Sequence, residues 1–255
     1  MESNLFNLSG KVAVITGGNG GIGLGIASGL ASAGASIIIA ARDQAKTDQA
    51  VKQLEPLGTD VIGTTTDVSD EISVRQMVKT TLDRFGAIDI LVNNAGTTVR
   101  KAPQEYTLEE WNHVFDINMT GTYLSAREAY APMVENGGGK IINIGSMTSI
   151  FGSDWVSAYA ATKGGVVQLT KSLAVAWAKD NIQVNSILPG WIHTNLTSAI
   201  RTGSPERYEF ITSRIPNGRW GEPADLSGTA VFLASAASNY VTGASIPVDG
   251  GYTSF

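Results

Sequence analysis

A tyrosine, a lysine and a serine stand where they could move a proton on and off an oxygen atom. Tyr159 and Lys163 are four residues apart, which places them on one face of a helix. A phenol with its usual pKa of about 10 is a poor acid or base near neutral pH, and a neighbouring ammonium group is expected to lower that pKa. Ser146 could hold a substrate oxygen against the same phenol. The same spacing also occurs on many solvated helices, so the pair alone is weak evidence for catalysis.

A glycine-rich turn near the N-terminus is the second candidate for chemistry. An apolar strand expected at Val12–Thr16 is followed by this turn, a helical pattern and a second apolar strand within about 30 residues. The residues of the turn are Gly17, Asn19, Gly21, Ile22 and Gly23. Glycines let a backbone approach a pyrophosphate, and a helix N-terminus offers free N–H groups and a positive dipole end. A structural turn that binds no ligand is the alternative.

Composition excludes several kinds of partner. The 255-residue chain has a net charge of −5 and no basic block, so nucleic acid and membrane surfaces are not expected partners. It has no cysteine, which excludes disulfides and thiolate metal sites, and His113 and His193 stand far apart, so no metal site is expected. The segment Met1–Asn7 carries an acid and no apolar core. This favours a cytoplasmic protein without a secretory signal.

Strand-like and helix-like stretches alternate along the chain. The expected strands are Val12–Thr16, Ala35–Ala41, Asp60–Thr66, Ile88–Val92, Lys140–Gly145, Ile182–Leu188 and Ser245–Val248. The expected helices include Glu71–Phe85, Thr107–Glu135, Ala158–Lys179 and Ala224–Ala234. Such alternation implies βαβ units and a parallel sheet covered on both faces. We predict one α/β domain over residues 1–255, a doubly wound Rossmann-type fold with a seven-stranded parallel sheet.

Residues 190–216 break this alternation, because they are polar with scattered hydrophobic side chains. The sequence supports two interpretations of this segment equally. The segment forms a mobile lid that excludes water from the substrate, or it is a long surface loop.

Several motifs resemble those of the short-chain dehydrogenase/reductase family, and the resemblance covers the whole chain. The motifs are Thr16–Gly23 (TGGNGGIG), Asn93–Gly96 (NNAG), Asn118, the set of Ser146, Tyr159 and Lys163, and Pro189–Gly190 followed by Ile192 and Thr194. The resemblance implies hydride transfer between a nicotinamide cofactor and a small alcohol–ketone pair.

The resemblance also implies roles for four residues. Tyr159 would be the general acid in reduction and the base in oxidation, and Lys163 would lower its pKa and bind the nicotinamide ribose. Ser146 would orient the reacting oxygen and stabilise charge on it. Asn118 would hold a water that relays protons to Lys163. Without the family, an amide bonded to its own helix backbone would be the preferred interpretation of Asn118.

The cofactor is expected to be NADP(H) rather than NAD(H). The second strand ends at Ala41, where an acid would bind the ribose 2′-hydroxyl of NAD. Arg42 follows, and a guanidinium can fork onto a 2′-phosphate. Asp43 is adjacent, but as the expected N-cap of the next helix it would be engaged there. The glycine turn has Gly20 where many NADP-using relatives carry a basic residue.

The resemblance implies further cofactor contacts. Asp67 and Val68 would bracket the adenine ring, although Asp67 could equally cap the next helix. Asn94 and Gly96 belong to the NNAG motif, and Pro189, Gly190, Ile192 and Thr194 would hold the nicotinamide carboxamide.

The substrate is the least determined part of the prediction. Segments near residues 93–103 and 214–221 resemble those of sugar-acid members such as gluconate 5-dehydrogenase and 2-deoxy-gluconate 3-dehydrogenase. Arg100 would then pair with a substrate carboxylate, unless it is a solvated charge on the rim. Met147, Trp155 and Trp191 would line a pocket for a bulky ketone or pack between lid and core.

Three other expectations stay open. A broad-range NADPH carbonyl reductase or a β-ketoacyl-carrier-protein reductase is the alternative enzyme, and a non-catalytic cofactor-binding scaffold is the alternative outside catalysis. Relatives are usually tetramers, so a homotetramer is expected, with the tail Val248–Phe255 near an interface. An apolar stripe on the second long helix (Val166, Leu169, Leu173, Trp177) suits contact between subunits or packing within one.

Overall fold

Seven parallel strands form one sheet through the centre of the molecule, in the order β3-β2-β1-β4-β5-β6-β7. The structure is a computed structural model that describes residues 5–254. The strands are β1 (Val12–Thr16), β2 (Ser36–Ala41), β3 (Val61–Thr65), β4 (Ile90–Asn93), β5 (Gly139–Ile144), β6 (Ile182–Pro189) and β7 (Ser245–Val248). The predicted fold class is therefore confirmed, and each strand end lies within two residues of its predicted position.

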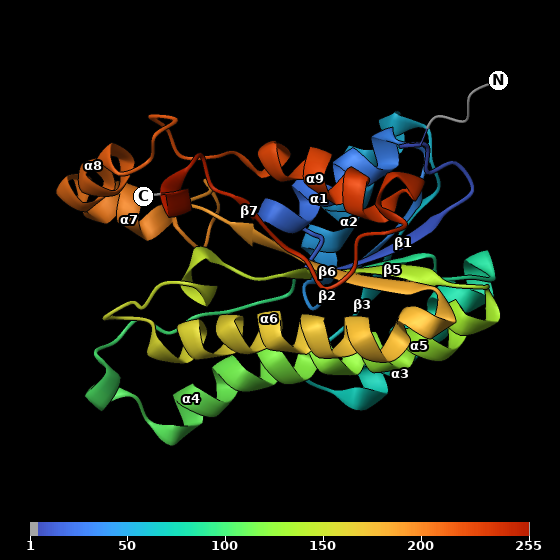
Figure 1. Cartoon of the computed structure of the whole chain (residues 1–255), viewed down its shortest axis with the longest axis horizontal. Coiled ribbons are helices and arrows are strands. Elements are labelled where there is room, and N and C mark those ends of the chain that lie inside the picture. The colour runs from blue at the N-terminus through green and yellow to red at the C-terminus, as the bar shows by residue number, and fades with distance from the viewer. Residues whose placement is uncertain (1–4, 255) are drawn as a thin grey trace.

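Helices cover both faces of the sheet (Figure 1). On one face lie α1 (Gly21–Ser32), α2 (Gln44–Leu54) and α9 (Ser227–Ala234); on the other lie α3 (Glu71–Phe85), α4 (Leu108–Phe115), α5 (Gly121–Glu135) and α6 (Ser157–Trp177). Two short helices, α7 (Ser198–Gly203) and α8 (Pro205–Ser213), project beyond one end of the sheet. Within residues 5–254, no helix has the length and apolar character needed to cross a bilayer.

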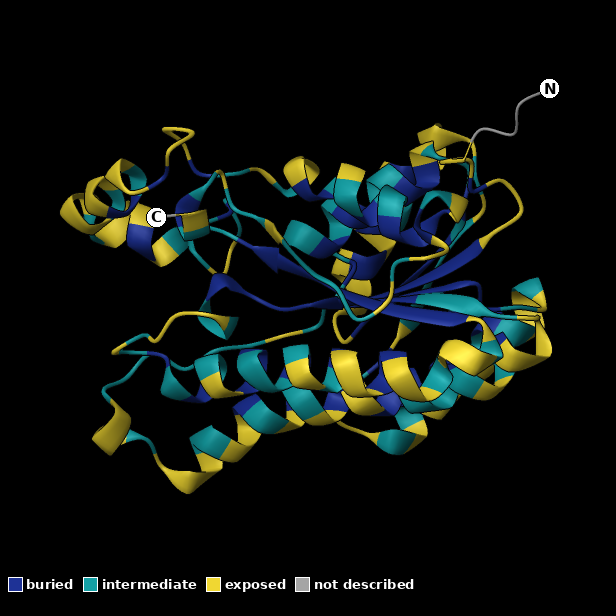
Figure 2. Ribbon diagram, viewed as in Figure 1, coloured by how far each residue is buried: buried dark blue, intermediate teal, exposed yellow. Residues whose placement is uncertain are grey.

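Alternation of side chains along each strand gives the sheet two separate cores. Ala13 and Ile15 of β1 point to the core that contains Ile26 of α1, and Val12 and Val14 point to the opposite core. Because both faces are covered, the strands carry continuous apolar runs rather than alternating ones. The inner strands in Figure 2 are accordingly mostly buried, whereas the edge strands β3 and β7 are partly exposed, and many of the exposed residues lie on the outer surfaces of the helices.

Two segments differ from their predicted form. The stretch Thr107–Glu135, predicted as one helix, is divided by a π-helical turn at Asp116–Thr120 between α4 and α5. Such turns are rare and often occur at functional sites, and this one contains Asn118. Residues 190–216, predicted as a lid or loop, contain α7 and α8.

The strand order creates the crevice in which a ligand of such a fold binds. β1 and β4 are neighbours, with Thr16 opposite Asn93, and the chain leaves them toward opposite faces of the sheet. Their carboxyl ends therefore lie at a topological switch point. The glycine turn follows β1 and the NNAG motif follows β4, so both motifs meet at this crevice.

The apolar stripe of α6 packs within the subunit. Val166 and Leu173 are buried, and Leu169 and Trp177 pack against the core on that face of the sheet. The stripe therefore gives no support for contact between subunits, and the homotetramer stays a prediction. Residues 1–4 and Phe255 lie outside the described residues. The predictions made for Met1–Asn7 and for the tail Val248–Phe255 therefore fall partly outside the structure.

Candidate active site

The glycine turn has a backbone that other residues would disturb. Gly17 and Gly21 have φ angles of +62° and +50°, in the region that favours glycine. A Cβ atom on Gly23 would lie 2.4 Å from the side chain of Asn94 and 2.5 Å from the carbonyl oxygen of Gly17. Because these glycines have no side chains, α1 can begin directly against the end of β4.

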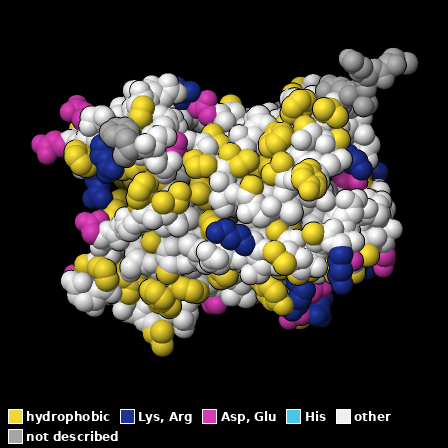
Figure 3. Space-filling view, viewed as in Figure 1, with side chains coloured by type: hydrophobic (Ala, Val, Ile, Leu, Met, Phe, Trp, Pro, Cys, Tyr) yellow, Lys and Arg dark blue, Asp and Glu magenta, His cyan; other side chains and the backbone are white. Residues whose placement is uncertain are grey.

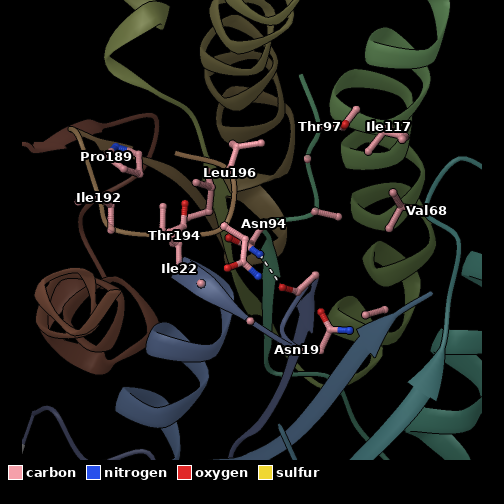
Figure 4. Close-up of a pocket in the computed structure, with 18 of the residues that line it drawn as sticks. Asn19, Ile22, Val68, Asn94, Thr97, Ile117, Pro189, Ile192, Thr194 and Leu196 are labelled. Atoms are coloured by element: carbon pink, nitrogen blue, oxygen red, sulfur yellow. Dashed lines mark hydrogen bonds between the residues drawn. The ribbon is translucent and has the colours of Figure 1, made fainter. Parts of the chain in front are cut away.

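Asn94 and Thr16 fix this turn to the NNAG segment. The Asn94 amide group donates hydrogen bonds to the carbonyl oxygens of Thr16 and Gly17, each at 3.0 Å. The Thr16 hydroxyl accepts from the backbone N–H groups of Asn94 and Ala95, each at 3.1 Å. Figure 4 shows the Asn94 side chain turned toward the glycine turn. Asn94 thus holds the shape of the crevice as well as lining it.

The N-terminus of α1 suits an anion. Gly20 precedes the helix with no side-chain cap, and the first turn contains no acidic residue. The first N–H groups and the positive dipole end therefore have no negative side chain in their own first turn. A pyrophosphate group fits this chemistry and this open backbone, which agrees with the predicted dinucleotide site.

A cavity of about 450 Å³ runs along the carboxyl ends of the strands. It brings together almost all the predicted cofactor and catalytic residues, several of which Figure 4 shows around it. Those that line it are Gly17, Asn19, Gly21, Ile22, Arg42, Asp67, Val68, Asn94, Gly96, Ser146, Tyr159, Lys163, Pro189, Gly190, Ile192 and Thr194. Gly23 is instead buried behind the turn.

One end of this cavity carries the residues expected to select the cofactor. Arg42 and Lys46 both line it and both are exposed. The Asp43 carboxylate accepts a hydrogen bond from the backbone N–H of Lys46 and caps α2, as predicted. Lys46 was not predicted, although a basic residue one turn beyond Arg42 is a signal that could have identified it.

Asp67 lines the cavity, and its carboxylate accepts hydrogen bonds from the backbone N–H and the hydroxyl of Ser69 at 2.9 and 2.6 Å. It does not cap the next helix, so that alternative is wrong, and its contact with an adenine ring stays a prediction. Burial acts to raise the pKa of this carboxyl, but the Ser69 hydrogen bonds and the charge of Arg42 hold it below its usual value. Asp70 is the residue that caps α3.

At the other end of the cavity lie Ser146, Tyr159 and Lys163. Ser146 caps a short turn at Met147–Ser149. The Ser149 hydroxyl donates to the carbonyl oxygen of Lys163 at 2.7 Å and accepts from the backbone N–H of Ser146. This link ties the end of β5 to the first turns of α6, so the serine and the tyrosine keep a fixed relation.

The phenol of Tyr159 is less acidic than the spacing suggested. Burial raises its pKa, while a hydrogen bond with Ser146 and the charge of Arg100 act to lower it. The Lys163 Nζ atom lies 5.6 Å from the centre of the Tyr159 ring and donates to the carbonyl oxygen of Ile144 at 2.7 Å. The lowering of this pKa by Lys163 therefore stays a prediction.

Lys163 is itself perturbed. Its side chain is buried, and burial lowers its pKa to about 8. An amine with this pKa exists in both protonation states slightly above neutral pH, so it can accept and release protons in that range.

Asn118 does not bond to its own helix backbone. Its amide donates to the carbonyl oxygen of Thr97 and to the hydroxyl of Thr162, and its oxygen accepts from the backbone N–H of Thr97. It is fully buried, and a Cβ on Gly96 would lie 3.4 Å from its oxygen and 3.6 Å from the Lys163 Nζ atom. Asn118 therefore sits beside Lys163 and ties the loop after β4 to α6.

None of the four residues predicted to bind the substrate lines the cavity: Arg100, Met147, Trp155 and Trp191. Met147 is buried in a hydrophobic cluster with Ile200, Ile211 and Trp220 of the 190–220 region, and Trp155 and Trp191 pack against that cluster. The packing interpretation of these three residues is therefore the one seen. Arg100 donates to the carbonyl oxygen of Leu196, which lines the cavity.

Comparison with known proteins gives the family. A family model described as "Enoyl-(Acyl carrier protein) reductase" matches residues 17–253. Together with the relatives below, this match shows that the chain belongs to the short-chain dehydrogenase/reductase family, a class of oxidoreductase, as the motifs predicted.

Three relatives illustrate how close the similarity is. The chain is 42% identical over 253 residues to the 2-dehydro-3-deoxy-D-gluconate 5-dehydrogenase of Dickeya dadantii, with 99% of both chains covered. It is 39% identical over 249 residues to the 5-keto-D-gluconate 5-reductase of Escherichia coli, with 98% of both covered. The crystal structure of a gluconate 5-dehydrogenase from Burkholderia cenocepacia, in complex with NADP and tartrate, matches with a TM-score of 0.94 at 39% identity, covering 99% of this chain and 98% of that one.

Proposed function

We propose that this protein interconverts a secondary alcohol and a ketone in a sugar acid, with a nicotinamide dinucleotide as cofactor. One observation carries the proposal: a single cavity joins a helix N-terminus suited to an anion to Ser146, Tyr159 and Lys163. The relatives named above as gluconate and 2-dehydro-3-deoxy-D-gluconate enzymes support the sugar-acid class.

The residues of the site would handle the proton and the oxygen. A bound nicotinamide supplies or accepts the hydride in this class of reaction. In reduction, the Tyr159 phenol donates a proton to the oxygen that becomes the alcohol, and in oxidation its phenolate takes that proton back. The Ser146 hydroxyl, hydrogen-bonded to the phenol, holds the same oxygen and stabilises its charge.

Lys163 and Asn118 would connect this step to solvent. The raised pKa of Tyr159 means that the phenol needs help to ionise, and the Lys163 amine beside it, with a pKa of about 8, can take up and release protons slightly above neutral pH. Asn118 fixes the loop that passes over Lys163, through its two hydrogen bonds to Thr97. The 190–216 segment, which carries α7 and α8, would close over the substrate and exclude water.

We propose NADP(H) as the preferred cofactor. Arg42 and Lys46 line the cavity next to a strand end that carries Ala41 rather than an acid. The nearest acid, Asp43, is engaged in capping α2, so it is poorly placed to repel a 2′-phosphate. Arg42→Ala should raise the KM for NADPH about tenfold, because hydrogen bonds to a charged group are lost, and should leave the KM for NADH little changed. An unchanged KM for NADPH would show that Arg42 does not read the phosphate.

A carbonyl reductase for bulky ketones remains the second candidate, because aromatic side chains crowd the lid. Trp191 and Trp220 have ring centres 5.1 Å apart, and Trp220 stacks on Tyr208 at 4.8 Å. These rings pack against one another, so they favour a stable lid more than an open apolar pocket.

The test is turnover of NADPH and NADH with 5-keto-gluconate and an aryl ketone, followed by absorbance. Preferred turnover of the keto acid supports the proposal, and preferred turnover of the aryl ketone replaces it with the second candidate. Tyr159→Phe should lower kcat by about 10²- to 10⁴-fold while NADPH still binds, as judged by its fluorescence. A protein with no turnover of any ketone would be a binding scaffold instead.

A further inference from the structure

The nine arginines of the chain fall into two groups. Four make ion pairs with carboxylates: Arg75, Arg84, Arg127 and Arg219. The others have no carboxylate partner within the part of the chain that the structure describes: Arg42, Arg100, Arg201, Arg207 and Arg214. In a chain with net charge −5, acidic partners are plentiful. Arginines left without one are therefore candidates for binding an anion from outside.

Two of these unpaired arginines meet at one aromatic ring. The Cζ atom of Arg207, in the first turns of α8, lies 3.9 Å from the centre of the Trp155 ring, and that of Arg100 lies 5.4 Å from it. Trp155 itself is held by a backbone hydrogen bond in which the Lys101 N–H donates to its carbonyl oxygen at 3.0 Å. Three segments far apart in sequence thus bring two guanidinium groups to the same place.

The aromatic contact leaves these guanidinium groups able to bind an anion. A cation–π contact engages the face of a guanidinium, while its N–H donors point outward in the plane. Arg100 uses one donor for the carbonyl oxygen of Leu196, and its buried Nε atom has no acceptor among the described residues. Arg207 is exposed and makes no hydrogen bond or ion pair within residues 5–254.

The local electrostatics also favour an anion. Burial lowers the pKa of Arg100, and the charge of Arg207 lowers it further, so the two positive charges repel each other at this site. Arg207 stands at the N-terminal end of α8, where the helix dipole adds positive potential. A carboxylate between the two guanidinium groups would offset the repulsion between their charges and would accept hydrogen bonds from the N–H donors of both. Figure 3 shows both basic and acidic side chains at the end of the molecule that carries α7 and α8.

We propose that Arg100 and Arg207, both stacked against Trp155, form a clamp for the substrate carboxylate, in which Arg207 is a specificity-determining residue. This inference rests on the proposed function and extends it from one arginine to two. Arg100 acts on the phenol of Tyr159 through its charge. Arg207 belongs to α8, which projects beyond one end of the sheet, so in this clamp it holds the end of the substrate that is remote from the reacting carbon. Because Arg207 belongs to α8, binding of the carboxylate also fastens the lid.

The experiment compares a keto acid with an uncharged analogue of the same length. 5-Keto-gluconate and its primary amide are assayed as substrates of the wild type, Arg207→Gln and Arg207→Lys. Arg207→Gln should lower the ratio of kcat/KM for the acid to that for the amide by about tenfold, mainly through the KM for the acid. Arg207→Lys should give a ratio between those of the wild type and Arg207→Gln, because lysine keeps the positive charge but lacks the paired N–H donors of a guanidinium.

Arg214→Gln is the matched control, since Arg214 also stacks on an aromatic ring, that of Tyr252 at 4.6 Å, and has no carboxylate partner in the described chain. The control should leave the ratio unchanged. If Arg207 only fastens the lid, Arg207→Gln would lower both kcat/KM values together with no change in their ratio, and the clamp would be excluded.

A second readout keeps the clamp separate from the proposed function. If the protein turns over an aryl ketone but no sugar acid, the proposed function fails. Inhibition of that turnover by tartrate still tests the clamp, because a carboxylate should compete for the two arginines. Inhibition of the wild type about tenfold stronger than that of Arg207→Gln supports the clamp; equal inhibition, or none of the wild type, overturns it.

Discussion

The two ends of the cavity are built in different ways. The end around the glycine turn is made of backbone: glycines, a helix N-terminus, and main-chain atoms that hydrogen-bond with the side chains of Asn94, which donates, and Thr16, which accepts. The lid end, which is the region beside the other end and includes the proposed lid at residues 190–216, is held together by side chains, with arginines on Trp155 and a cluster of aromatic rings around Trp220. A backbone site has one shape fixed by the fold, whereas a side-chain site can change its ligand by single substitutions.

This difference explains what each end is suited to bind. A dinucleotide is the same for many enzymes, so a rigid backbone cradle serves it, and its phosphates need only N–H groups. A substrate differs from one enzyme to the next and must enter and leave, so residues of a lid are suited to recognising it. Substitutions at the first end should therefore damage the cradle itself, and those at the second should change selectivity or lid stability.

The largest expected effect concerns Gly23. In Gly23→Ala the new methyl group would overlap the Gly17 carbonyl oxygen and the Asn94 side chain, and such overpacking typically costs about 1–3 kcal/mol. We expect the affinity for NADPH, measured by its fluorescence, to fall by up to about 100-fold. Gly228→Ala in α9 is the control, since its methyl group would meet nothing within 4 Å. Equal affinity in the two variants would mean that the cradle is not rigid.

An intermediate effect is expected at Lys163, in the catalytic part of the cavity. Its folded-state pKa of about 8 lies below the usual 10.5, so the folded state disfavours the charged amine. The destabilisation is complete below pH 8, is relieved between pH 8 and 10.5, and is absent above. Lys163→Met should abolish activity but raise the free energy of unfolding at pH 7 by about 2 kcal/mol, after allowing for the lost hydrogen bond to Ile144.

Lys140 provides the control for Lys163. Burial also lowers its pKa to about 8, but it donates to Ser238 and Asn239 and does not line the cavity. Lys140→Met should keep activity, with a smaller change in stability. Urea unfolding at pH 7 and pH 10.5 measures both variants. A stability gain for Lys163→Met that is the same at both pH values would contradict the assignment of the effect to the buried charge.

The same contrast between backbone and side chains decides how far the sequence could predict this structure. The fold and the cradle follow from local patterns, because apolar runs define strands and only glycine fits the turn after β1. The pKa of Tyr159 could not be predicted, since it depends on burial and on the direction in which Lys163 points, toward Ile144. Arg207 was missed because it meets Trp155 only through tertiary contacts, across 52 residues of sequence.

The smallest expected effect tests how the lid end is held together. The Trp220 indole donates to the Thr212 hydroxyl at 3.0 Å, whereas the buried indole N–H of Trp191 has no acceptor among the described residues. A double-mutant cycle of Trp220→Phe with Thr212→Val should give a coupling of about 1 kcal/mol in the free energy of unfolding. The matched cycle of Trp191→Phe with Thr212→Val should give a coupling near zero.

The coupling between Trp220 and Thr212 matters because it contributes to the free energy of local opening of the proposed lid. If the lid end depends on a few side-chain contacts of about 1 kcal/mol each, it can open locally while the glycine cradle stays folded. Native-state hydrogen exchange should then show that the α8 amides exchange faster than those of α1, and that Trp220→Phe speeds exchange in α8 alone. Equal couplings in the two cycles would show that general packing of the rings holds the lid, and that the Thr212 hydrogen bond has no separate part in it.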